Sequence, residues 1–320
     1  MIEREPLQVL ITVDTEIWCD DWAAIDRQFD DAFARYIHGR TPEGEFGLPY
    51  QLRTLRAHDL RAVYFVEPLF AARFGQERLA EIVALVHEGG QPVELHLHTE
   101  WVDEAIEPLL AAPQGKRQHL NLFSGAEQRI LIAAGADLLT RAGAGPLRAF
   151  RAGNFGANDA TLPAVAANGI GIDSSYHAAS PHCAIEPAAP MQQPRRVGGV
   201  IEFPVSCFGD GLGRVRPASL NAASAREIAQ ALQDAWRQGW RYFVIVMHSF
   251  DLLDRHRRHA NPIALRRFHG LIEFLARNRD RFRTTDFGAA PAVGGAEVPL
   301  RCGLWPTLGR IGEQMRSRLA

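Results

Sequence analysis

The chain has 320 residues, of which 47% are hydrophobic and 22% are charged, and its formal net charge is −2. This composition is typical of a globular protein with ample apolar material for a large core. The small net charge gives no reason to expect a nucleic acid or another polyanion as a partner.

Segments typical of strands and of helices alternate along the chain. Strands are expected at 7–13, 62–66, 92–98, 147–152, 170–173, 200–205, 242–247 and 282–286. Helices are expected at 50–58, 77–88, 125–142, 159–168, 223–238 and 262–277. Such alternation implies βα units with right-handed crossovers. We therefore predict an α/β fold, a single distorted (β/α) barrel of seven or eight mostly parallel strands. A doubly wound open sheet is the alternative.

Three stretches interrupt this alternation. Residues 17–48 follow the first strand and are expected to form a lid or a substrate wall. Residues 177–200 are rich in Ala and Pro and predict a long loop on the same rim, and residues 288–300 are typical of a linker. Leu308, Ile311, Met315 and Leu319 then lie at helical spacing.

The domain organisation follows from these stretches. We predict one barrel domain at 1–287, with rim insertions at 17–48 and 177–200, and a linker with a C-terminal helix at 288–320. The helix at 307–319 could dock on the barrel, pair with a second subunit in a homo-oligomer, or touch a membrane surface. Docking is the interpretation that we favour.

No targeting or spanning segment is visible in the sequence. Residues 1–6 are polar and lead straight into a strand, and no run is long enough to cross a membrane. The cysteines lack CxxC spacing and indicate reduced thiols. We expect a cytoplasmic protein, with a peripheral position at the inner membrane as a variant of that expectation.

Polar side chains follow four of the expected strands, where α/β folds place their chemistry. The first strand runs into Asp14 and Glu16, and the third into His96, His98 and Glu100. The fourth runs into Arg151 and a glycine-rich turn at 153–156, and the seventh ends at His248. This combination of residues suits metal-assisted hydrolysis.

The first and third strand ends predict a metal site. Asp14 and Glu16 point to the same side of a strand, so one can hold a metal while the other takes a proton from water. His96 and His98 alternate in the same way, and imidazole suits zinc. Glu100 is close enough to join, which leaves the third ligand open between His98 and Glu100. The alternative is that Asp14 caps a turn and the histidines belong to the core.

The other strand ends predict the acid–base groups. Arg151 beside Asp14 would keep that acid ionised, and the turn could offer backbone N–H groups to an oxyanion. Asp173 either caps a turn or orients His248 and sets its pKa. Ser249 as a nucleophile is discounted, because the chain has no GxSxG elbow.

The order of these motifs resembles the polysaccharide deacetylase family, the NodB-homology or carbohydrate esterase family 4 proteins. The resemblance covers most of residues 7–286 and rests on the strings at 12–16, 95–101, 150–154, 172–175 and 245–248. In overall look the chain is most similar to deacetylase-like proteins of bacterial surface-polysaccharide clusters. In the family two histidines stand four positions apart, whereas here Glu100 occupies the second of these positions, and Glu16 replaces the usual Asp.

The resemblance implies a NodB-like barrel and a role for each motif. Asp14 would be the general base, Arg151 would orient it, and His248 would be the general acid, held by Asp173. Glu16 and His96, with His98 or Glu100, would hold one divalent ion, for which zinc is expected and cobalt or nickel are alternatives. The residues expected to bind the substrate are Gly153, Asn154, Phe155, Trp18 and Trp101, the aromatic ones by stacking on a sugar ring or else as core.

The implied reaction is hydrolysis of an N-acyl group, expected to be acetyl, from a nucleotide- or lipid-linked amino sugar of surface polysaccharide biosynthesis. One alternative is a deformylase or cyclic-amide hydrolase on the same scaffold. Another is a catalytically inactive sugar-binding relative. A glycoside hydrolase needs two carboxylates on opposite faces of the sugar, and Asp14 and Glu16 are too close in sequence for that.

Overall fold

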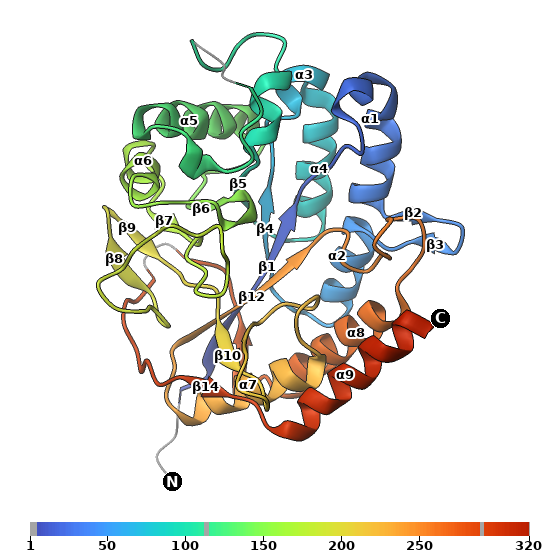
Figure 1. Ribbon diagram of the computed structural model, residues 1–320, viewed down its shortest axis with the longest axis vertical. Helices are drawn as coiled ribbons and strands as arrows, with labels where there is room; N and C mark the ends of the chain where they lie inside the picture. The colour runs from blue at the N-terminus through green and yellow to red at the C-terminus, as the bar shows by residue number, and fades with distance from the viewer. Residues whose placement is uncertain (1–4, 112–114, 289–290, 320) are drawn as a thin grey trace.

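The computed structural model describes residues 5–111, 115–288 and 291–319, with only the course of the helix given for 316–319 (Figure 1). Both chain ends and residues 289–290 of the expected linker lie outside the described residues. The division into a domain at 1–287 and a tail at 288–320 stays a prediction.

One curled sheet forms the centre of the molecule. Its strand order is β12-β1-β4-β5-β6-β7-β9-β8, and β13 also pairs with β1. The parallel strands are β1 (Leu7–Thr15), β4 (Val63–Val66), β5 (Val93–Leu97), β6 (Ala149–Ala152), β7 (Ile172–Asp173), β9 (Val200–Glu202), β12 (Tyr242–His248) and β13 (Phe282–Thr284). Only β8 (Arg195–Val197) runs antiparallel. From β1 to β9 the order never reverses, as in a barrel, so the predicted distorted barrel is confirmed and the doubly wound alternative is wrong.

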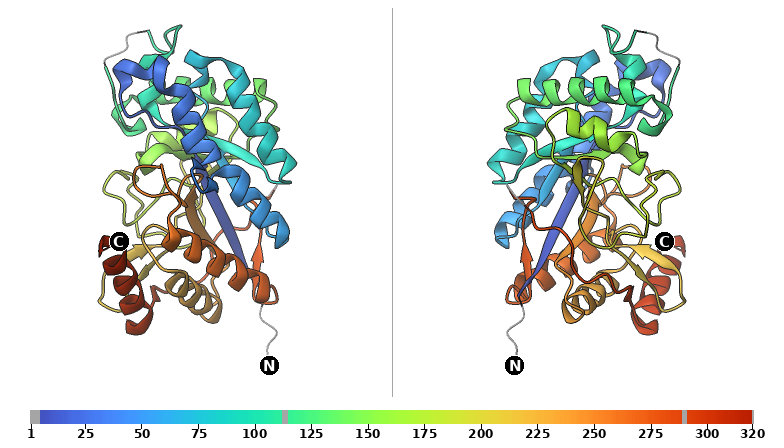
Figure 2. Two further views of the ribbon diagram at one scale, coloured as in Figure 1. Left: turned by 90° about the vertical axis from the view of Figure 1, so that its right-hand side faces the viewer. Right: turned by 90° about the vertical axis from the view of Figure 1, so that its left-hand side faces the viewer.

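Helices surround this sheet (Figures 1 and 2). They are α1 (Ile25–Phe33), α2 (Leu48–Ala57), α3 (Ala71–Phe74), α4 (Gln76–Glu88), α5 (Gly125–Arg141), α6 (Thr161–Ala167), α7 (Ala225–Arg237), α8 (Pro262–Arg277) and α9 (Leu304–Leu319). Local signals start several of them where the sequence predicts. Ser124 and Ser224 each form a capping box with the glutamate three residues later, and Asn261 caps α8 ahead of Pro262.

Short elements that the sequence did not predict lie in the first insertion and in other connections between the main strands and helices. A hairpin of β2 (Arg40–Thr41) and β3 (Gly44–Glu45) lies within 17–48. A small sheet joins β10 (Cys207–Gly209), β11 (Val215–Pro217) and β14 (Leu300–Arg301). Single turns of other helix types are η1 (Trp22–Ala24), η2 (Ala34–His38), η3 (Thr99–Glu104), η4 (Leu120–Leu122) and η5 (Gly153–Phe155). Strands of two or three residues are too short to leave a periodic pattern.

Side chains on the two faces of β1 belong to two different apolar clusters. Val9, Ile11 and Val13 belong to the main core cluster, whereas Leu10 belongs to a second apolar cluster with side chains from β4, β6, β7, β9 and β12. Because side chains alternate along a strand, Asp14 lies on the same face as Leu10. The second cluster therefore supports the strand ends that carry Asp14.

Helix α9 packs against α7 and α8, as we favoured from the sequence (Figures 1 and 2). The Arg310 guanidinium donates to the carboxylates of Glu227 and Asp210, with N–O distances of 3.0 Å. All three side chains are buried. In the described part of the chain, no helix combines the length and the apolar character that a bilayer span requires.

Replacing Arg310 with Ala should destabilise the protein by about 3–5 kcal/mol, because two buried carboxylates lose their counter-charge. The matched control is Arg277→Ala, which breaks the exposed pair with Glu273 and should cost under about 1 kcal/mol. Urea unfolding followed by circular dichroism measures both. Equal losses in the two variants would contradict a docking role for Arg310.

Candidate active site

Polar side chains converge on a cavity of about 320 Å³ at the carboxyl ends of the parallel strands. Strand register brings them together, since Asp14 of β1 lies opposite His248 of β12, and His96 of β5 lies opposite Arg151 of β6. The cavity is lined by Asp14, Glu16, His96, Asn154, Phe155, His177, Ala179, Ser180, His182, Pro217 and His248.

Glu16, His96 and His98 form a group that could hold a metal ion. Each offers a ligand atom, the three atoms lie within 4.8 Å of one another, and all three residues are buried. Carboxylate Oε2 of Glu16 is 3.2 Å from Nε2 of His96 and also contacts Nε2 of His98. Two imidazoles and one carboxylate form a ligand set that is common at catalytic zinc sites.

The hydrogen bonds of His96 make this group suited to a cation. Nδ1 of His96 lies 2.9 Å from the Arg151 carbonyl, which can only accept, so Nδ1 must carry the proton. In the neutral ring, Nε2 then directs its lone pair at the Glu16 carboxylate. A lone pair facing a carboxylate is repulsive unless a proton or a metal ion lies between them, so the donor set fits a divalent metal.

The position of Glu100 decides which side chain completes the group. Its Oε2 is 3.4 Å from Nδ1 of His98, whereas Glu16 contacts the Nε2 of that ring. His98 therefore belongs with Glu16 and His96 in the group that could hold a metal ion, whereas Glu100 lies on the other side of the His98 ring. The expected ligand role of Glu100 is corrected accordingly, because Glu100 forms an ion pair with His98 and is not part of this group.

Buried charges in this group stabilise one another. Burial works to lower the pKa of His98, but the charges of Glu16 and Glu100 raise that pKa well above its ordinary value. Burial works to raise the pKa of Glu16, yet the neighbouring charge of His98 holds it well below the ordinary value. The pocket therefore keeps Glu16 anionic and favours positive charge beside it.

The predicted tryptophans do not line the cavity. Trp18 donates its indole N–H to Oε1 of Glu16 at 2.8 Å, and its ring lies edge-on to His98. Trp18 therefore contacts two of the three residues that could hold a metal ion, whereas it was predicted to stack on a sugar ring. Trp101 is 1% exposed and packs edge-on against Trp22 and Phe29, which agrees with the alternative that it belongs to the core.

The turn after β6 supplies the predicted residues 153–155. Gly153 lies beneath His98, where an added Cβ would come within 2.8 Å of ring atoms. Asn154 and Phe155 have positive φ angles of 52° and 58°, and both line the cavity. The Nδ2 atom of Asn154 is buried without a hydrogen-bond partner among the described residues. Such strain at a cavity and such an unpaired donor are typical of a ligand contact.

Arg151 and Asp14 form a fully buried ion pair, with 2.7 Å between Nη1 and Oδ1. The other guanidinium hydrogen bonds reach the hydroxyl of Thr12 and both the carbonyl and hydroxyl of Ser174. The predicted proximity of Arg151 to Asp14 is thus present. Because Arg151 approaches Oδ1 alone, Oδ2 of Asp14 stays available to the cavity.

His248 pairs with Asp251, a partner that our sequence analysis did not assign. Its Nδ1 is 3.2 Å from Oδ1 of Asp251, and its backbone N–H donates to Oδ2 at 2.9 Å. Burial works to lower the pKa of His248, but Asp251, with Glu16 and Asp14, raises it to about 9. Asp251 stands only three positions after His248, so that spacing was the available signal.

Asp173 does not hydrogen-bond His248, which corrects the predicted pairing. Its carboxylate accepts from the backbone and hydroxyl of Ser175 at 2.9 Å each. The neighbouring Glu202 accepts from the N–H of Tyr176, and burial together with Asp173 raises the pKa of Glu202 well above its ordinary value. This pair of acids supports the loop after β7, as a turn-capping Asp would.

Two histidines of the predicted rim loop also line the cavity, and the sequence analysis did not single them out. His177 accepts the N–H of Ala179 at its Nδ1, so Nε2 carries the proton in the neutral ring. Burial lowers the pKa of His177 to about 4, which keeps the ring neutral at pH 7. His182 stacks on His119 at the same cavity. The histidines at 177 and 182 were the available signal.

Ser249 is not placed as a nucleophile. Its hydroxyl is fully buried and donates to the Tyr36 carbonyl at 3.0 Å. The serine-hydrolase alternative therefore has no exposed nucleophile at this strand end.

A solved structure has a fold similar to that of this chain. A structure from Mycobacterium smegmatis, provisionally described as a polysaccharide deacetylase, aligns over 99% of this chain and 96% of its own, with a TM-score of 0.52 and 16% identity. This chain has the fold of a polysaccharide deacetylase. At this identity the match shows the fold alone.

Two further structures are similar at lower scores. The family 4 carbohydrate esterase from Streptomyces lividans, in complex with acetate, aligns over 92% of this chain and 99% of its own, with a TM-score of 0.46 and 16% identity. A family 4 pseudoenzyme from Bacillus anthracis aligns over 88% and 64%, with a TM-score of 0.43 and 10% identity. The sequence matches no protein-family model, and no curated protein is significantly similar to it.

Replacing Gly153 with Ala should weaken metal binding at least tenfold, because the new methyl group would displace the His98 ring. Gly145→Ala is the matched control, since an added Cβ there meets nothing within 4 Å. Calorimetric titration of each variant with zinc measures the effect. Unchanged affinity in Gly153→Ala would mean that His98 is not a ligand.

Proposed function

We propose that the protein is a metal-dependent hydrolase that removes an N-acyl group, acetyl in the simplest case, from an amino sugar. The observation that carries this proposal is that three groups of side chains meet at one cavity. These groups are the buried cluster of Glu16, His96 and His98, the Asp14–Arg151 ion pair, and the His248–Asp251 pair. Zinc is the metal that we propose, because imidazole and carboxylate ligands suit it.

Asp14 would act as the general base. Asp14 lines the cavity, and the Arg151 guanidinium on Oδ1 fixes the orientation of the carboxylate and leaves Oδ2 for another partner. A metal ion in the adjacent group would polarise the acyl carbonyl and make water easier to deprotonate. Asp14, two residues from Glu16, would take the proton of that water.

His248 would act as the general acid. Asp251 contacts Nδ1 of His248, so the proton on Nε2 of that ring can be donated to the departing amine. A pKa of about 9 keeps the ring protonated at neutral pH. Asn154 and His177 each offer a donor at the cavity that the described residues leave unpaired, Nδ2 of Asn154 and Nε2 of His177, for the oxygens of the substrate.

The contacts of Glu16 count against a glycoside hydrolase. Glu16 contacts two histidines and accepts the indole N–H of Trp18, so Asp14 lacks a free carboxylate partner at β1. The cavity is large enough for one sugar ring with its acyl group. We further propose that the sugar is a nucleotide- or lipid-linked intermediate of surface polysaccharide biosynthesis.

The test joins metal content with activity. Protein purified without chelators or an affinity tag should hold about one divalent ion per chain by mass spectrometry, and His96→Ala should lose it. Asp14→Asn should keep the ion yet lower release of acetate from N-acetylamino sugars by at least a hundredfold. Wild-type protein that stays empty in added zinc, cobalt and nickel would refute the metal-dependent reaction.

The pH profile tests His248 separately. Activity that needs protonated His248 should be present below the raised pKa and fall as the pH passes about 9. Asp251→Asn removes the charge that raises this pKa while an amide oxygen can still accept the backbone N–H. The alkaline limb should therefore move to lower pH. A limb that stays in place would show that another group sets it.

A further inference from the structure

The outward face of α9 is apolar. Leu304, Trp305, Leu308 and Met315 are exposed by 47%, 82%, 42% and 61%. At about 100° of rotation per residue, they lie within roughly a third of the circumference of the helix. An apolar face is what a surface helix normally buries, so α9 has the reverse orientation.

Charged and polar side chains hold the opposite face to the barrel. Arg310 binds Glu227 and Asp210, and Thr307 accepts the N–H of Gly211 at 2.9 Å. Glu313 pairs with Arg267 of α8 at 2.9 Å. These contacts fix the rotation of α9, so its apolar residues cannot turn inward without breaking buried ion pairs.

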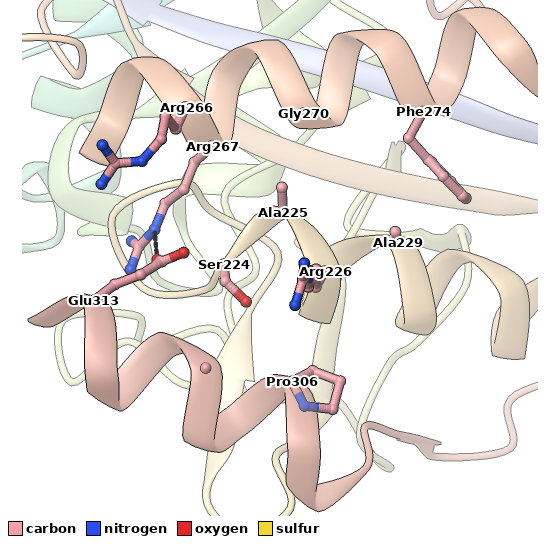
Figure 3. Close-up of a pocket in the computed structure, with 11 residues that line it drawn as sticks. Ser224, Ala225, Arg226, Ala229, Arg266, Arg267, Gly270, Phe274, Pro306 and Glu313 are labelled. Atoms are coloured by element: carbon pink, nitrogen blue, oxygen red, sulfur yellow. Dashed lines mark hydrogen bonds and ion pairs between the residues drawn. The ribbon is translucent and has the colours of Figure 1, made fainter. Parts of the chain in front are cut away.

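A cationic groove runs beside this helix (Figure 3). It lies between α7, α8 and α9, has a volume of about 490 Å³, and includes Ala225, Phe274 and Pro306 in its lining. The side chains of Arg226 and Arg266 also line it, both exposed. Within the described ranges, neither guanidinium has a hydrogen bond or ion pair, whereas the neighbouring Arg267 is paired with Glu313 (Figure 3).

The turn between β10 and β11 extends the same surface. Gly211 lies against Leu304, so this turn borders the start of α9. Leu212 of the turn and Val215 at the start of β11 are 55% and 60% exposed, and Arg214 between them is exposed as well. Apolar and basic side chains therefore alternate on this surface too.

We propose that the surface of α9, with the groove of Arg226 and Arg266, binds an anionic lipid bilayer. A bilayer offers hydrocarbon for the tryptophan and leucines and phosphate groups for the arginines. The acidic side chains that contact α9 are already paired with Arg310 or Arg267, so this surface has no spare negative charge of its own. A second copy of the chain fits less well, because a two-fold interface would bring like charges together.

Bilayer binding would place the candidate active site close to the membrane. Arg267 donates to the Leu220 carbonyl at 2.7 Å, and the adjacent Asn221 donates to Asp251 at 2.6 Å. Asp251 in turn holds His248. The groove is thus one loop away from the cavity, which suits a lipid-linked substrate, although the binding itself does not depend on the proposed reaction.

Flotation of the full-length protein with vesicles tests the proposal. Vesicles of phosphatidylcholine alone should bind little, and vesicles with about a third phosphatidylglycerol should bind at least tenfold more. Trp305→Ser with Leu308→Ser should abolish binding. Arg226→Gln with Arg266→Gln should weaken it about fivefold per arginine and reduce its dependence on salt.

Controls of the same chemistry lie elsewhere on the surface. Ile106→Ser removes an apolar side chain that is 72% exposed, and Arg27→Gln removes an exposed arginine on α1; both should bind vesicles as wild type does. Thermal unfolding should be unchanged in every variant. Absence of binding to anionic vesicles would overturn the proposal. A dimer in light scattering that the Trp305 and Leu308 changes dissociate, without vesicle binding, would assign the surface to a second copy.

Discussion

The buried residue Arg151 links the parts of the candidate site. Its guanidinium fixes Asp14 of β1 and reaches Ser174 after β7, while its own carbonyl determines which nitrogen of His96 carries the proton. One residue thus orients the proposed base and sets the tautomer of a proposed metal ligand. A charge with no exposed surface is tolerated here because each guanidinium nitrogen has a hydrogen-bond partner and Asp14 supplies the opposite charge, which ties Arg151 to one position.

Much of the fold could be predicted because its signals are local. Apolar runs identified β1 and β12 close to their observed bounds, and the helices expected at 125–142 and 223–238 are observed as α5 and α7, each started by a capping box. Alternation also placed Asp14 and Glu16 at the correct strand end. The short strands of the small sheet had no such signal, since pairing between distant segments forms them.

The site was predicted less completely because spacing in the sequence does not settle which of several nearby side chains contacts a given ring. Glu100 and His98 both fitted a ligand role by spacing, and only the ring orientation separated them. Asp173 was predicted either to cap a turn or to orient His248, and it is Asp251, three positions after His248, that contacts that ring. Trp101 was predicted either to stack on a sugar ring or to belong to the core, and in the structure it packs in an aromatic cluster.

Helix α9 also shows that a sequence pattern can predict an element without predicting which of its side chains make contacts. Its apolar spacing predicts an amphipathic helix but does not say which face docks, because ion pairs can hold a helix as firmly as leucines do. Here the buried Arg310 makes the polar face the docked one. Buried ion pairs add little net stability over apolar packing, but they specify a single orientation. That orientation leaves an apolar face beside Arg226 and Arg266, which the described residues leave unpaired, and the chemical complement of this combination is an anionic membrane surface.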